Sequence, residues 1–166
     1  MSIRPVLVLP DPILSRPSEA VGAPGPAALA LAGDLVDTMR ASPACVGLAA
    51  PQIGVGLRAF VMDVSAHPKA RSCHGLVVLF DPELLESSGP EVAREGCMSV
   101  PDLTGDVRRA TRVVVSGTTP EGERRVLEAD AFEARALLHE MDHLDGAVFL
   151  DRVTGPHAVF PRKVYR

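Results

Sequence analysis

The segment HEMDH at residues 139–143 constrains this chain more than any other feature. It places His139 and His143 four residues apart, so that both imidazole rings lie on the same face of an α-helix. Two such rings can bind one divalent metal ion, and Glu140, one residue further round the helix, can take a proton from a water molecule beside that ion. The spacing therefore predicts a hydrolytic metal site carried by a helix.

The residues around this motif predict a helix over residues 131–144. Asp130 and Glu133 have the spacing of a capping box at its start, and Gly146 stands where a left-handed C-terminal cap is common. Apolar side chains cover nearly the whole circumference, which predicts a central, buried helix. Buried histidines need partners. The alternative to a metal, simple hydrogen bonds to backbone, is disfavoured because a chain with only five histidines rarely shows this spacing by chance.

A catalytic metal usually has three protein ligands and one open position, so a third ligand is needed. Cys97, in the segment EGCMS at residues 95–99, is the best upstream candidate, because a thiolate is a soft, charged ligand and Gly96 allows close approach of the backbone. Alone, such a cysteine is more often a small core residue. Beside the histidine helix, metal ligation is the favoured interpretation. The downstream candidates lack the spacing typical of zinc peptidases: Asp145, Asp151 and His157.

A run of small residues, CVGLAAPQIG, occupies residues 45–54 and contains Gln52, whose amide could donate to a developing oxyanion. Taken alone, the run indicates only tight packing. Taken in order, however, GLAAPQ, EGCMS and HEMDHLDG closely resemble the three signature motifs of the peptide deformylases, with fitting separations. The resemblance extends over nearly the whole chain.

This resemblance implies that Cys97, His139 and His143 bind one divalent metal ion and that Glu140 is the acid/base. The ion would be ferrous iron, with nickel, cobalt or zinc able to take its place. The implied reaction removes the formyl group from formyl-methionyl peptides and releases formate. The implied partner is a formylated peptide or a nascent chain.

The resemblance also implies an oxyanion hole formed by Gln52 and the backbone N–H of Met98. It places further residues along the substrate, namely Cys45, Val46, Gly47, Leu48 and Gly96. Backbone near Val46 and Gly47 would pair with an extended peptide.

Three positions depart from the family pattern. Cys45 replaces the usual first glycine, Leu138 replaces a glutamine before the first histidine, and Thr104 stands where an arginine is common. The metal ligands are unaffected. If the side chain of Cys45 lines the pocket, it would narrow the space near the metal; the alternative is that it points into the core. Thr104, in place of an arginine, removes a cation that could bind a peptide. Two alternatives follow: a specialised deformylase or deacylase of a small formylated metabolite, and a low-activity resistance homologue.

Composition fits one compact enzyme. A length of 166 residues with 46% hydrophobic content predicts a single domain over residues 1–166 with a substantial core. The net charge of −4 argues against a specific nucleic-acid binder. Three scattered cysteines form no disulfide framework, which favours the reducing cytoplasm, and no apolar stretch reaches membrane-spanning length.

The C-terminal residues 152–166 contain four basic residues and no acid. This charge could support a weak contact with an anionic partner such as the ribosome. A solvated tail is the alternative, and it is the favoured one.

The chain reads as an α+β protein. A helix is expected from Pro26 to a point before Pro43. Strands are expected over 57–64 and 76–80, with a loop over 65–75 between them, and a hairpin joins 111–115 to 124–127 through a turn at 119–122. Strands that precede one apolar helix predict antiparallel β-sheets packed around a central C-terminal metal-binding helix.

Overall fold

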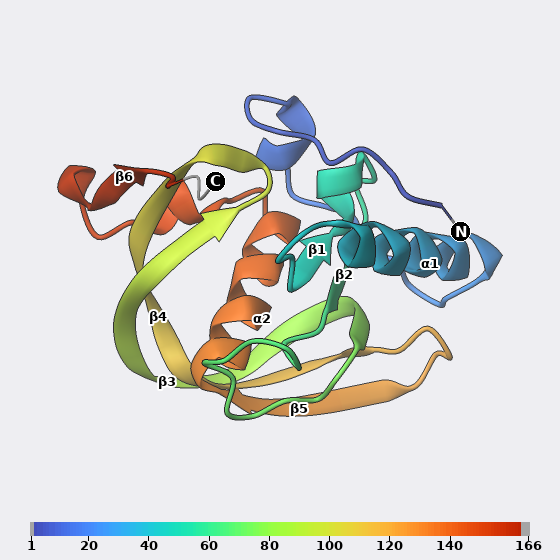
Figure 1. Cartoon of the computed structure of the whole chain (residues 1–166). Helices are drawn as coiled ribbons and strands as arrows, with labels where there is room; N and C mark the ends of the chain where they lie inside the picture. Colours follow the sequence, from blue (N-terminus) through green and yellow to red (C-terminus); the bar gives the residue numbers. More distant parts are fainter. Residues whose placement is uncertain (1, 164–166) are drawn as a thin grey trace.

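The computed structural model describes residues 2–163 and shows an antiparallel sheet wrapped around one helix (Figure 1). The strands are β1 (Gly47–Ala49), β2 (Ala59–Met62), β3 (Val77–Cys97), β4 (Val100–Thr118), β5 (Arg124–Asp130) and β6 (Val159–Pro161). They are connected in the order β1-β2-β3-β4-β5, and β6 pairs with β4. The α-helices are α1 (Pro26–Ala41) and α2 (Ala131–Leu144), and short 3-10 helices cover Pro12–Ser15, Ala50–Ile53, Phe149–Arg152 and Pro156–Ala158. The predicted α+β class is confirmed.

Helix α1 begins at Pro26 and ends just before Pro43, as predicted. Proline is favoured in the first helical turn because its missing N–H has no partner there in any case. The buried face of α1 packs against β1 and β2, and its members recur at helical spacing: Ala28, Leu31, Ala32, Leu35 and Met39.

Strand β2 lies between the two helices, and all four of its residues are buried. Ala59 and Val61 belong to the core formed with α1, whereas Phe60 and Met62 belong to the core formed with α2. This division follows the twofold alternation of side chains along a strand. Strand β2 therefore couples the two halves of the core.

Strands β3 and β4 form a long hairpin, of which only the ends were predicted. The predicted strand over 76–80 is the start of β3, which continues to Cys97. The intervening residues are mostly exposed and polar, so they lack the apolar alternation that marks a half-buried strand. Register shifts between Phe80 and Glu86 and again at Gly96 bend the hairpin, which curves around α2 in Figure 1. The bend brings Cys97 over the helix.

The predicted hairpin between residues 111–115 and 124–127 is confirmed. Val113 pairs with Ala129 and Val115 with Leu127, and the turn is closed by the N–H of Gly122, which donates to the carbonyl of Thr119 at 2.9 Å. This turn leads through β5 directly into α2.

The bounds of α2 match the predicted helix, but its capping box is not formed. Asp130 instead accepts the N–H of Ser72 at 3.0 Å, and the fully buried Glu133 accepts from the Ser72 hydroxyl and the His74 N–H. The two carboxylates thus tether the loop over 65–75. Sequence spacing could not distinguish this tertiary use from a local cap.

Gly146 has the predicted left-handed conformation, with φ of +80°. A Cβ atom at this position would also lie 2.8 Å from the backbone carbonyl carbon of Arg16. Only glycine satisfies both conditions, so the chain can turn sharply after the metal helix.

The C-terminal segment folds back onto the sheet as far as Arg162, so this part of the predicted tail is not free in solvent, although many of its side chains are exposed. In β6, Phe160 pairs with Thr104 and Pro161 with Leu103. The last basic residue of the predicted tail, Arg166, lies outside the described residues. Among residues 2–163, no helix combines the length and the apolar character needed to cross a membrane.

Candidate metal centre

The three side chains predicted as metal ligands converge at one point. One ligand atom each from Cys97, His139 and His143 lies within 4.8 Å of the other two. Cys97 Sγ is 3.3 Å from His143 Nε2, and the centroids of the two imidazole rings are 5.1 Å apart. The end of β3 supplies the sulfur and α2 supplies both rings, so the long curved hairpin is what completes the site.

The donor set suits a divalent ion with one open position. Glu95 Oε1 is 2.8 Å from His139 Nδ1, which leaves Nε2 of that ring for a metal. Burial lowers the pKa of His143, which favours the neutral form needed for ligation. Glu140 Oε2 is buried without a hydrogen-bond partner among the described residues. One thiolate and two imidazoles are typical ligands of iron or zinc. A water molecule bound beside such an ion could donate a hydrogen bond to the unpartnered carboxylate oxygen of Glu140.

Glu140 is poised for proton transfer. Burial raises its pKa to about 7, even though the charges of His139 and Arg109 act in the opposite direction. A divalent cation next to Glu140 would also act to lower this pKa. A general base or acid works best when its pKa lies near the operating pH. Its burial and its place beside the metal ligands therefore suit this carboxylate to accept a proton and to return it.

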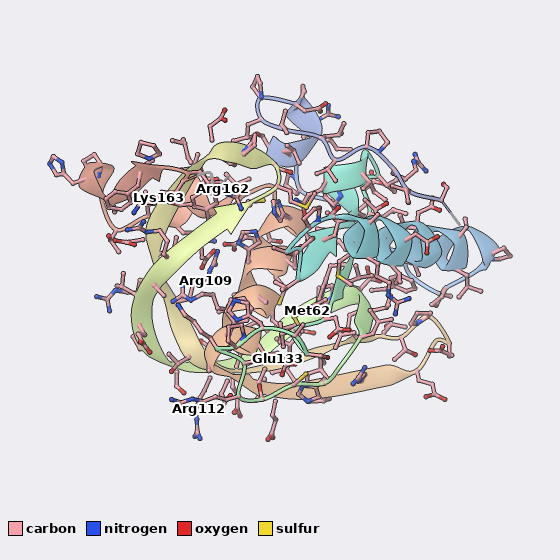
Figure 2. The ribbon with its side chains drawn as sticks, in the orientation of Figure 1. Met62, Arg109, Arg112, Glu133, Arg162 and Lys163 are labelled. Carbon is pink, nitrogen blue, oxygen red and sulfur yellow. The ribbon has the colours of Figure 1, made fainter. Side chains whose placement is uncertain are left out.

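A buried network of charges supports His139. Glu95 accepts from Arg109 at 2.6 and 3.0 Å and from Arg135 at 2.7 Å, and Arg109 also donates to Asp142 at 2.7 Å. Burial alone would raise the pKa of Glu95, but hydrogen bonds from His139 and Arg109 outweigh it and lower the pKa to about 2. Figure 2 labels Arg109 beside the metal helix.

This network of buried charges was not predicted from the sequence. A signal was present, because Arg135 and Asp142 are charged residues on a helix predicted to be buried, and buried charges require partners. The pattern could have predicted that partners exist. It could not have named Arg109, whose position depends on the curvature of β4.

Gln52 has a fixed orientation at the edge of the site. Its Oε1 accepts the N–H of Ala49 at 3.0 Å, so its Nε2 points the other way, 3.1 Å from Ser99 Oγ and 3.6 Å from Cys97 Sγ. Ser99 in turn donates to the carbonyl of Leu7 at 2.8 Å. The amide N–H of Gln52 is thus directed to the metal ligands, although the supporting role of Ser99 was not predicted.

A cavity of about 210 Å³ opens above the ligands. Its wall includes most of the predicted substrate-side residues, namely Cys45, Val46, Gly47, Gly96 and Met98, together with Gln52 and Glu140. Leu48 is not part of this wall, contrary to expectation. Its side chain is fully buried in the core against α1, because successive side chains of β1 point to opposite faces.

Strand β1 offers a free backbone edge to this cavity. It is the terminal strand of the sheet order and pairs only with β2. Asp63 donates its N–H to the carbonyl of Val46 at 2.8 Å, and Gly47 is the next residue, opposite Met62. In an antiparallel ladder the backbone groups alternate, so the N–H and C=O of Gly47 point away from β2. An extended chain could pair there.

Cys45 lies in the cavity wall, as one of the two predicted interpretations had it. Its Sγ donates to the carbonyl of Gly47 at 3.1 Å. Burial, together with the charge of Glu140, raises the pKa of Cys45 to about 11, so the side chain is a neutral thiol. Of the other departures, Leu138 packs against the core and Thr104 pairs with Gly96 across β3 and β4.

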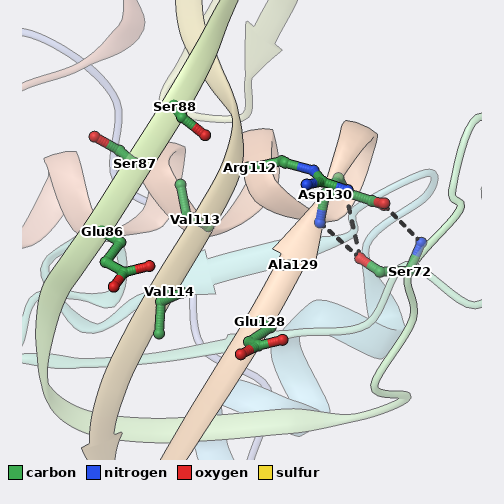
Figure 3. A pocket seen from close by; sticks show the side chains of 10 residues that line it. All are labelled: Ser72, Glu86, Ser87, Ser88, Arg112, Val113, Val114, Glu128, Ala129 and Asp130. Atoms are coloured by element: carbon green, nitrogen blue, oxygen red, sulfur yellow. Dashed lines mark hydrogen bonds between the residues drawn. The ribbon is translucent and has the colours of Figure 1, made fainter.

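A larger hollow of about 710 Å³ lies between β3, β4 and β5 (Figure 3). It is lined by Ser72, Arg112 and Asp130 among others, and contains none of the metal ligands. The hydrogen bonds between Ser72 and Asp130 that tether the 65–75 loop form one side of it in Figure 3. The smaller cavity above the ligands is therefore the candidate active site.

Comparisons with known proteins agree with this geometry. A family profile described as polypeptide deformylase matches residues 3–158. The peptide deformylase of Desulforudis audaxviator is 42% identical over 165 residues, which cover 98% of this chain and 99% of the relative. That of Carboxydothermus hydrogenoformans is 41% identical over 152 residues, covering 92% and 94%. The crystal structure of the Ehrlichia chaffeensis peptide deformylase in complex with actinonin superposes with a TM-score of 0.86 at 33% identity, covering 93% of this chain and 90% of that one.

Proposed function

The chain belongs to the peptide deformylase family, whose members remove the N-terminal formyl group from nascent peptides and release formate, and we propose a mechanism for this reaction at the metal centre. The observation that carries the mechanism is the convergence of Cys97, His139 and His143 beside the buried, unpartnered oxygen of Glu140. The proposed substrates are formyl-methionyl peptides. Because nascent chains are made in the cytoplasm, the reaction would take place there. Residues 1–166 would form a single domain.

Cys97, His139 and His143 would hold one divalent ion. Ferrous iron is the proposed native metal, with nickel, cobalt or zinc able to occupy the same ligands, because thiolate and imidazole suit all of them. When bound, the ion supplies a Lewis acid that polarises the formyl oxygen and makes a water molecule more acidic. Glu95 holds the Nδ1 side of His139 and so orients that ligand.

The reaction then depends on proton movement at Glu140. Its carboxylate takes a proton from the attacking water as the new C–O bond forms at the formyl carbon. It then passes that proton to the amide nitrogen, and the formyl C–N bond breaks to release the amine. The Nε2 of Gln52 and the backbone N–H of Met98 donate to the carbonyl oxygen as negative charge develops on it. The fixed orientation of the Gln52 amide supports this role.

The peptide would add to the open edge of β1 near Val46 and Gly47, through the outward N–H and C=O of Gly47, as in other cases of strand addition. A cavity of about 210 Å³ admits a small acyl group and disfavours larger ones. Ribosome contact through the basic C-terminal residues stays a prediction. Of these residues, Arg152 binds Asp142 at 3.2 Å and Arg162 lines the cavity.

Formate release tests the proposal. The metal-loaded protein should release formate from formyl-Met-Ala-Ser with much higher kcat/KM than from acetyl-Met-Ala-Ser or a small formylated amide such as N-formylpropylamine. The acetyl peptide tests the effect of acyl-group size, and the small formylated amide tests whether the peptide backbone is needed. A preference for the small amide would overturn peptide deformylation in favour of a metabolite substrate, and no release from any of them would indicate a homologue that only binds.

A further inference from the structure

The C-terminal segment delivers one arginine to the mouth of the active site. The N–H of Arg162 donates to the carbonyl of Asp102 at 2.9 Å, immediately after β6 pairs with β4. Its Nη1 lies 3.5 Å from the carbonyl of Cys97, and its Nη2 would lie 3.5 Å from a Cβ atom on Gly96. The guanidinium therefore sits over the end of β3 and lines the cavity; Figure 2 labels the residue.

Among the described arginines of this wall, Arg162 is the one that is not paired with a carboxylate. Arg94 is paired with Asp106 at 2.7 Å and stacks on Phe160, and Arg135 is paired with Glu95. Within residues 2–163, Arg162 has no carboxylate partner, and its side chain is exposed. A guanidinium has five N–H donors, and only one of them is directed to the protein, at the long distance of 3.5 Å.

Thr104 lies beside Gly96, next to the cavity wall. Its Cγ2 would lie 3.5 Å from a Cβ atom on Gly96, the same distance as Arg162 Nη2. Thr104 is neutral and short, so it brings no cation to this place. The guanidinium of Arg162 thus reaches the place next to Gly96 that a longer, charged side chain at position 104 would fill.

We propose that Arg162 is a substrate-positioning residue whose guanidinium binds the backbone carbonyl oxygen of the second residue of the formylated peptide. This inference rests on the proposed function. The guanidinium of Arg162 lies beside Gly96, which is one residue along β3 from the ligand Cys97, and one residue of an extended peptide spans a similar length. A backbone carbonyl is present in every peptide, so the contact contributes affinity without selecting a sequence.

Two neutral substrates test this contact, because one carries the second carbonyl and the other ends before it. Formyl-methionyl-alaninamide has it, and formyl-methionine methylamide lacks it. Arg162→Gln keeps a donor for Cys97 but loses the charge, and it should raise KM for the first substrate about tenfold with little change in kcat, the size expected for one charge-assisted hydrogen bond. KM for the second substrate should stay within twofold of wild type.

Lys163→Gln is the matched control, because it removes a neighbouring charge of the same segment that does not line the cavity, and it should behave like wild type. The double variant Thr104→Arg with Arg162→Gln should recover most of the lost affinity, since it returns a cation to the wall. Unchanged KM in Arg162→Gln, or an equal loss on both substrates, would overturn the role. Metal content and melting temperature confirm that each variant is folded. If the wild-type protein released no formate, the proposed function itself would be wrong. If the wild type is active and Arg162→Gln has normal KM, only the role of Arg162 is wrong.

Discussion

A Cβ atom on Gly47 would lie 2.8 Å from Oε1 of Glu140, closer than such atoms approach in folded proteins. The backbone of β1 therefore touches the acid/base carboxylate directly. We predict that Gly47→Ala displaces Glu140 and lowers kcat at least about tenfold, because correctly placed acid/base catalysis contributes roughly 10²- to 10⁴-fold. The metal should remain, since no ligand is touched. Steady-state kinetics and metal analysis on the same sample check this.

Gly56→Ala is the control for that variant, because a Cβ atom on Gly56 meets nothing within 4 Å. It should leave both kcat and metal content unchanged. Equal kcat in the two alanine variants would show that Glu140 tolerates the added methyl group.

Replacing the carboxylate itself separates binding from chemistry. Glu140→Gln keeps the shape of the side chain and should keep the metal, while kcat falls about 10²-fold or more because no group accepts the proton of water. Formate release and metal content are the measurements. Turnover close to wild type would assign the proton to another residue.

The metal site could be predicted because its information is local. His139, Glu140 and His143 lie within five residues, and helical geometry alone places them on one side. The bounds of α2 followed from propensity and from Gly146 in the same way. Cys97 required more, because it precedes the helix by more than thirty residues: its thiolate chemistry made it the best upstream candidate, and the family resemblance then implied it as a ligand.

What could not be predicted depends on tertiary curvature. The exposed middle of β3 shows no apolar alternation, and the buried positions in the middle of β4 include Gly105 and Arg109, which are not apolar strand residues. The hairpin that carries Cys97 and Arg109 around α2 therefore leaves no strand signal. Asp130 and Glu133 have the spacing of a helix cap but bind the 65–75 loop. Arg162 reaches the cavity only because β6 pairs with β4, a contact between short segments that sequence patterns do not specify.

Glu95 should be essential to both stability and metal affinity. In Glu95→Gln the buried guanidinium groups of Arg109 and Arg135 both lose the Glu95 carboxylate, although Arg109 keeps Asp142, and this loss should cost about 3 kcal/mol of unfolding free energy. His139 loses its orienting carboxylate at the same time, and metal affinity should fall about 10- to 100-fold. Denaturant unfolding and chelator competition measure the two effects.

Glu91→Gln on the same strand provides the comparison, since its side chain is exposed and its backbone carbonyl still accepts from Arg135. It should leave both quantities near wild type. A Glu95→Gln protein with normal stability and metal affinity would mean that the buried charges compensate one another without Glu95.

Purified protein should contain about one divalent ion per chain, and His143→Ala should lose it because two ligands remain where three are needed. His157→Ala is the control, an exposed histidine outside the cluster. If iron is the native metal, activity should decay in air and return with nickel, because thiolate-ligated ferrous iron is oxidised. Elemental analysis after anaerobic purification decides the metal, and full occupancy in His143→Ala would reject the ligand set.

The thiol of Cys45 donates a hydrogen bond to the carbonyl of Gly47. This carbonyl is a backbone acceptor on the open edge of β1 that a peptide N–H could otherwise use. Cys45→Gly removes this internal donor and widens the wall, so KM for formyl-methionyl peptides should fall about threefold, the value of one modest hydrogen bond. Cys45→Ser keeps a donor at the same place and should resemble wild type. Comparing the two variants on the same peptide isolates the hydrogen bond from the loss of sulfur. If both leave KM unchanged and Cys45→Gly only lowers the melting temperature, Cys45 acts in packing, where a lost side chain costs about 1–3 kcal/mol, and not in substrate binding.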